Sequence, residues 1–263
     1  MIKKELLSHY KGFLICLLVL VGMFLMVYVL YPFLINEETT QAIEELMKMM
    51  PEDILKSFNM DMSSIATAYG WLKSEGFVYV LITVGIYSSI LGANIVLKEE
   101  IDKTSEYLSF LPIKRNHILT NKIIVSLIYI FGMIIAFTLF NYAGLSISGK
   151  FDVKEFLLLS VSPLLTAVPL FFISLFISTL VHRNKRIVGL SLIIVLVSYV
   201  LNAVSEISDK AEALKYLSIY TLSDVRGIIT NGKINYICII VSVGISFVFL
   251  VLSYIKYNRK ELV

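Results

Sequence analysis

Apolar and charged residues follow one another along this chain in long blocks. Six stretches of 19 to 27 residues contain no Asp, Glu, Lys or Arg: 12–36, 76–97, 123–149, 156–182, 187–205 and 234–255. A helix needs about 20 apolar residues to cross a bilayer, whereas a helix on the surface of a soluble protein keeps a polar face. The pattern therefore predicts six membrane-spanning helices, at about 12–35, 77–97, 118–145, 156–181, 187–204 and 234–255.

Composition agrees with an all-α integral membrane protein. The 263 residues are 57% hydrophobic and only 16% charged, where a soluble domain carries about 25% charged residues. We expect a single transmembrane domain over residues 1–263.

The basic residues predict which side each end occupies. An even number of spans places both termini on one side, and that side holds 14 of the 23 basic residues with six acidic ones, a net charge of +8. The opposite side has a net charge of −5. Because loops rich in Lys and Arg stay in the cytoplasm, we expect both termini to be cytoplasmic.

Two segments outside the predicted spans have helical character. Residues 1–11 predict a short interfacial helix, and residues 37–75 form the largest outer segment, with two amphipathic stretches separated by Pro51. We expect those stretches to lie on the outer membrane surface; a lid or a vestibule that contacts substrate is the alternative. Small residues of the second span predict close helix packing: Gly85, Ser88, Ser89 and Gly92. Pro163 and Pro169 of the fourth span fit either a kinked helix that lines a path or prolines tolerated within the bundle.

The chain offers little catalytic chemistry. Residues 144–151 imitate a phosphate-binding loop, but Phe151 stands where a hydroxyl should follow Lys150. The paired Glu99 and Glu100 lack the arginine of an intramembrane protease motif, and the three histidines show no metal-ligand pairing. The amides inside the spans are not ionisable, so they form no proton relay: Asn94, Asn141 and Asn202. We expect a protein that is not an enzyme, with no catalytic, metal or cofactor-binding residues of its own.

The passage between the second and third spans is densely charged. Ile101, Leu108 and Leu111 share one helical face, and Pro112 disfavours helical geometry at Leu111. Asn116 suits the cap of the next helix. The pattern predicts a short helix over about 99–112 on the cytoplasmic side; a solvated loop against lipid head groups is the alternative.

The sequence "EEIDKTSEYLSFLPIKR" in this passage resembles the signature of ABC-2-type transporter permeases, in which a run like E-x-x-x-G-T-x-E-x-L-L-S-L-P-I-x-R joins spans two and three. The matching residues include Glu99, Thr104, Glu106, Leu108, Leu111, Pro112, Ile113 and Arg115. The chain departs from the signature at Lys103, Ser109 and Phe110. Residues 214–233 are similar to the outer segment of the same family, L-S-P-F-x-Y-x-D, with Ile219 and Leu222 as departures.

The resemblance implies a fold and a mechanism. The fold would be the ABC-2 exporter-like (type V) half-transporter, a six-span permease subunit of an ATP-driven exporter. Its segment 99–112 would be a coupling helix seated in a separate ATP-binding subunit. Leu108, Leu111 and Pro112 would form the apolar wedge. The polar contacts with the ATPase would come from four other matched residues: Glu99, Thr104, Glu106 and Arg115.

The resemblance also implies partners. Two ATP-binding subunits would hold the ATP and Mg²⁺, because the cytoplasmic pieces of this chain are too short to contain an ATPase domain. A second permease subunit, identical or paralogous, would complete the channel in the plasma membrane, with no role for nucleic acid. The cargo would be amphiphilic or hydrophobic: a peptide, a drug or a lipid. Two alternatives remain, a regulatory or immunity subunit that transports nothing, and an unrelated six-span carrier.

Overall fold

The computed structural model describes residues 2–34, 41, 45, 46, 48–50, 67–101, 115–180, 186–207 and 209–259. These residues form a helical bundle, and none of them lies in a β-strand. The long helices are α1 (Ile2–Leu34), α6 (Phe77–Ile101), α8 (Arg115–Ser148), α10 (Leu164–Leu180), α11 (Arg186–Ile207) and α13 (Tyr236–Arg259).

Shorter helices precede or connect the long ones. They are α5 (Ala68–Trp71), the π-helix η1 (Leu72–Gly76), α9 (Val153–Val161), the 3₁₀-helices η2 (Asp209–Tyr216) and η3 (Tyr220–Ser223), and α12 (Val225–Asn231). Helices α5 and η1 continue into α6, and α9 is followed by α10, whereas η2, η3 and α12 lie between spans. Within the described residues, six stretches are long and apolar enough to cross a membrane. The sequence prediction of six spans is therefore confirmed.

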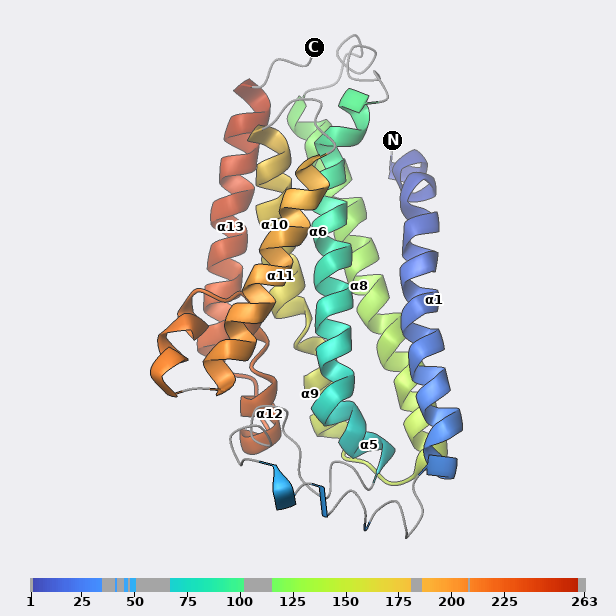
Figure 1. The fold of residues 1–263 in the computed structure, drawn as a ribbon. Helices are drawn as coiled ribbons and strands as arrows, with labels where there is room; N and C mark the ends of the chain where they lie inside the picture. The colour runs from blue at the N-terminus through green and yellow to red at the C-terminus, as the bar shows by residue number, and fades with distance from the viewer. Residues whose placement is uncertain are drawn as a thin grey trace.

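The two ends of the bundle contain different elements (Figure 1). The start of α1 and the end of α13 lie at the same end, together with the end of α6 and the start of α8. We call this the terminal end. The short helices α5, α9 and α12 lie at the opposite end.

Helices α6 and α10 form the centre of the bundle. Both are mostly buried and pack extensively against each other, whereas α1, α11 and α13 expose most of their apolar side chains. At Gly92 on α6 an added Cβ would lie 2.3 Å from the carbonyl oxygen of Phe171. The absence of a side chain at Gly92 is what lets the two helix backbones approach this closely.

Proline accounts for the shape of the fourth span. The helix breaks at Ser162 and Pro163, between α9 and α10. Pro163 has no N–H to donate to the carbonyl oxygen of Leu159, and that oxygen instead accepts from the hydroxyl of Ser162 at 2.9 Å. The backbone is thus satisfied within the apolar bundle, as a membrane-spanning segment requires. Of the two prolines, Pro163 lies at the break between α9 and α10, and Pro169 is tolerated inside α10.

Two boundaries differ from the sequence prediction. Helix α1 runs from Ile2 to Leu34 without a break, so no separate interfacial helix precedes the first span. The second span begins at Ala68, because α5 and η1 continue directly into α6. Residues 68–75, predicted to belong to the outer segment, are therefore the first turns of that span. The two amphipathic stretches predicted around Pro51 lie mostly outside the described residues.

Candidate functional site

The two helices that flank the predicted coupling segment meet at the terminal end, where α6 ends and α8 begins (Figure 1). Glu99 is in the last turns of α6, and Arg115 is the first residue of α8 with an exposed side chain. The other five predicted contact residues lie in 102–114, outside the described part of the chain: Thr104, Glu106, Leu108, Leu111 and Pro112. Residues 102–114 join two helices whose ends are fixed in the bundle, since Ile118 and Leu119 on α8 are buried.

A buried cation ties the first helix to this pair. Lys122 on α8 is 6% exposed, and its Nζ donates to the carbonyl oxygen of Ile95 on α6 at 3.0 Å. Nζ also lies 3.7 Å from the carboxylate of Glu5 on α1, which is itself 3.8 Å from His9 Nε2. Three helices thus meet around one lysine, two turns after the start of α8.

A cavity of about 190 Å³ opens at the opposite end of the bundle. Its walls come from η1, α6, α11, η3 and the start of α12. The lining residues are Ser74, Phe77, Val78, Leu81, Tyr199, Asn202, Ala203, Glu206, Tyr220, Thr221, Ser223, Asp224, Val225 and Arg226. We call this the outer-end cavity.

An ion pair forms the polar wall of the outer-end cavity. Glu206 Oε2 on α11 lies 3.2 Å from Nη2 of Arg226 on α12, and the two side chains are 31% and 32% exposed. Glu206 also accepts a hydrogen bond from the amide of Asn202, one turn earlier, at 3.0 Å. The Asn202 oxygen accepts from the hydroxyl of Thr221 at 3.0 Å. The end of α11 is therefore connected to both η3 and α12.

Asp224 begins α12 in an uncommon backbone conformation. Its φ of 43° lies in the left-handed region, which Asp tolerates better than most residues. The carboxylate accepts from the N–H of Gly227 at 3.2 Å, and a Cβ at position 227 would lie 2.3 Å from that carboxylate. Burial raises the pKa of Asp224 above its ordinary value, while the bond from Gly227 lowers it. Asp224 is thus the cap of α12.

Tyr220 anchors the same segment to the bundle centre. The side chain is 2% exposed, and its hydroxyl donates to the carbonyl oxygen of Leu81 on α6 at 3.4 Å. A Cβ at Gly85 would lie 2.2 Å from this hydroxyl. Gly85 therefore provides the space into which the tyrosine inserts.

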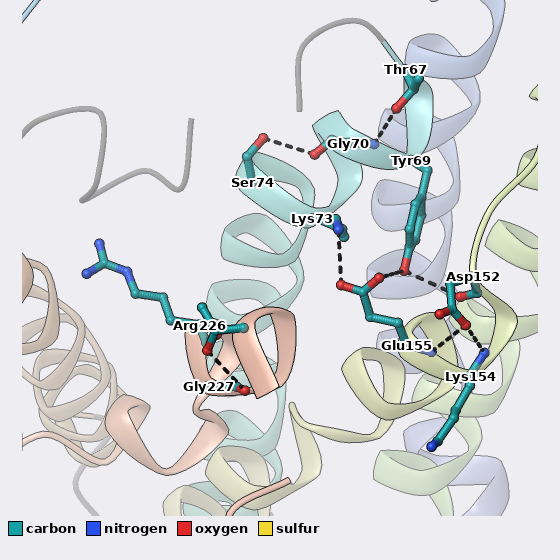
Figure 2. A network of polar contacts seen from close by, with 11 residues as sticks. Thr67, Tyr69, Gly70, Lys73, Ser74, Asp152, Lys154, Glu155, Arg226 and Gly227 are labelled. Atoms are coloured by element: carbon teal, nitrogen blue, oxygen red, sulfur yellow. Dashed lines mark hydrogen bonds and ion pairs between the residues drawn. The ribbon is translucent and has the colours of Figure 1, made fainter. Parts of the chain in front are cut away.

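The π-helix η1 forms the rim of the cavity beside α9. Figure 2 shows Lys73 and Tyr69 directed at the carboxylate of Glu155, at 3.0 and 3.2 Å. Ser74 of η1 lines the cavity itself. Single π-helical turns within longer helices occur frequently at functional sites.

Sequence reasoning did not identify the outer-end cavity. Asn202 and Glu206 are four residues apart at the end of a span, which is a signal for a shared helix face. Nothing in the sequence indicates that Arg226 pairs with them across a loop. Within the described residues, no three His, Cys, Asp or Glu side chains converge as a metal site would require.

The helical bundle with its six apolar spans defines a multi-pass membrane protein. A family model described as "ABC-2 family transporter protein" matches residues 4–262. The chain therefore belongs to the ABC-2 transporter family, and the resemblance found in its sequence is confirmed. Its class is that of a membrane permease subunit. A search of the curated proteins and a search of the solved structures each found no match.

Proposed function

We propose that this chain is the permease subunit of an ATP-driven exporter, moved by a separate ATP-binding subunit that grips residues 99–112. The family match over residues 4–262 carries the proposal. The arrangement of the bundle supports it, because α6 ends and α8 begins at the terminal end, on either side of this segment (Figure 1).

The proposed orientation has the terminal end in the cytoplasm. The described basic residues at that end include Lys3, Lys11, Arg186, Lys256 and Arg259. Both termini and the coupling segment would then be on the side where ATP is available. The outer-end cavity would face the outside.

The proposed grip uses an apolar wedge with charges around it. The wedge that enters a cleft of the ATPase consists of Leu108, Leu111 and Pro112. Polar side chains fix the position of this wedge in the cleft: Glu99, Thr104, Glu106 and Arg115. Closure of two ATPases around ATP and Mg²⁺ displaces α6 and α8 through this segment. Because α6 packs along α10, the displacement reaches the centre of the bundle.

The proposed assembly contains two permease and two ATP-binding subunits. The apolar side chains exposed on α1, α11 and α13 provide surface for lipid and for a second permease, either identical or paralogous. The cargo is amphiphilic or hydrophobic.

Co-purification tests the motor. The tagged protein is isolated from its native membranes in mild detergent, as wild type and as Leu108→Asp/Leu111→Asp, and the bound chains are identified. We expect an ABC ATPase to co-purify with the wild type, and the amount of bound ATPase to fall at least tenfold with the variant. The matched control is Tyr216→Asp/Leu217→Asp, which changes two exposed apolar residues remote from the coupling segment (82% and 69% exposed). An intact protein that retains no ATPase in any sample contradicts the proposal.

A further inference from the structure

The guanidinium of Arg226 is the least satisfied polar group of the outer-end cavity. Its Nε and Nη2 atoms are buried and make no hydrogen bond with any described residue. Nη2 lies 3.2 Å from Glu206 but without hydrogen-bond geometry. Nε and Nη2 form the side-on edge of the guanidinium, the edge that binds a carboxylate or a phosphate through two parallel bonds. Buried donors of this kind favour a ligand that accepts from both.

The charges around Arg226 restrict what that ligand is. Glu206 and Asp224 line the same cavity, so the lining carries two carboxylates and one guanidinium. A bare anion on Arg226 would leave the site with two uncompensated negative charges, which burial makes costly. A ligand that also carries an ammonium group adds no net charge, so one uncompensated negative charge remains instead of two. The rings of Tyr199 and Tyr220, 5.7 Å apart, offer that cation an aromatic surface.

The other wall of the cavity is apolar. Phe77, Val78 and Leu81 come from the first turns of α6, where it continues η1. The polar wall is at the last turn of α11, which is where the fifth span ends. The cavity thus combines polar side chains at the end of one span with an apolar wall on another helix. This combination suits an amphiphilic ligand that lies at the depth of the lipid head groups.

We propose that the outer-end cavity binds the zwitterionic head group of a phospholipid. The phosphate accepts from Nε and Nη2 of Arg226, the ammonium lies near Glu206 and Asp224, and the start of the acyl region packs on Phe77 and Leu81. Binding requires only residues of this chain, so the site stands whether or not an ATPase drives the protein.

The test uses the delipidated full-length protein in detergent and measures binding by microscale thermophoresis. The ligands are dihexanoyl phosphatidylethanolamine, dihexanoyl phosphatidylglycerol, which lacks the ammonium, and free aminoethyl phosphate, which lacks the acyl chains. We expect the first lipid to bind the wild type at least tenfold more tightly than the second. Free aminoethyl phosphate should bind more weakly than the lipid; equal affinity would identify a soluble zwitterion and overturn the role of the apolar wall.

Variants assign the binding to Arg226. Arg226→Gln should weaken binding of the zwitterionic lipid at least tenfold. Arg226→Lys keeps the positive charge opposite Glu206 but lacks the edge formed by Nε and Nη2, so it should weaken binding severalfold. The matched control Lys154→Gln removes an exposed cation on α9, at the same end of the bundle but outside the cavity lining, and should bind as the wild type does. No binding by the wild type, equal binding of the two lipids, or undiminished binding by a folded Arg226→Lys protein would overturn the proposal.

Discussion

The hydroxyl of Ser242 on α13 donates to the carbonyl oxygen of Leu165 on α10, at 2.8 Å. That oxygen lacks the usual helical donor, because Pro169, four residues later, has no N–H. One serine from a neighbouring span thus compensates for one proline, and the contact joins the last span to the centre of the bundle.

A double-mutant cycle measures this compensation. Ser242→Ala should lower the free energy of unfolding in mixed micelles by about 0.6–1 kcal/mol. In a Pro169→Ala background the same change should cost close to nothing, because the alanine backbone would supply the missing N–H. An equal cost of Ser242→Ala in both backgrounds would contradict the explanation.

Gly92→Ala tests the close approach of α6 and α10. The new Cβ would lie 2.3 Å from the backbone oxygen of Phe171, which only a shift of a helix relieves. We expect a loss of about 1–3 kcal/mol in the free energy of unfolding. Gly244→Ala on α13 is the control, since a Cβ there meets nothing within 4 Å. Similar stability of the two variants would rule out the close contact.

Lys122→Met tests the junction of α1, α6 and α8. The substitution keeps the length of the side chain but removes the donor to Ile95 and the cation near Glu5. The expected loss of unfolding free energy is about 1–3 kcal/mol, against little change for Lys11→Met, whose side chain is exposed. A Lys122→Met protein as stable as the wild type would show that the junction contributes nothing.

The sequence predicted the spans because each follows from a long run of apolar residues. It left open whether the prolines of the fourth span break the helix or are tolerated within it. It misplaced the start of the second span. Lys73 and Glu75 made residues 68–75 look like part of an outer segment. These residues instead belong to the helical span, and Lys73 pairs with Glu155 of α9. A charged residue in the sequence does not reveal an ion-pair partner that lies 82 residues away.

The outer-end cavity was beyond sequence reasoning for a similar reason. Asn202 was recognised as an amide within a span, and the likeness of residues 214–233 to the family drew attention to the segment that carries Tyr220 and Asp224. What brings Glu206 and Arg226 together is the return of the chain through η2 and η3 onto α11. The pairing depends on the insertion of Tyr220 beside Gly85, which no local pattern encodes.

The pH dependence of stability should report on Asp224. Burial holds its pKa above the ordinary value in the folded protein. A carboxyl with a raised folded pKa favours folding below its unfolded pKa, and this contribution is lost as the pH rises through the folded pKa. Asp224→Asn keeps a capping side chain. From about pH 4 upwards, the melting temperature of the wild type should therefore fall relative to that of Asp224→Asn. Parallel melting curves for the two proteins across this range would contradict the burial of Asp224.

Photo-crosslinking in native membranes tests the central claim, the grip of an ATPase on residues 99–112, most directly. A benzophenone amino acid is placed at position 111 in the predicted wedge and, in a second protein, at position 216, which is remote from it. The account predicts an adduct with an ABC ATP-binding subunit from position 111 and none from position 216. An adduct from position 216, or none with an ATPase from position 111 in an intact protein, would contradict it.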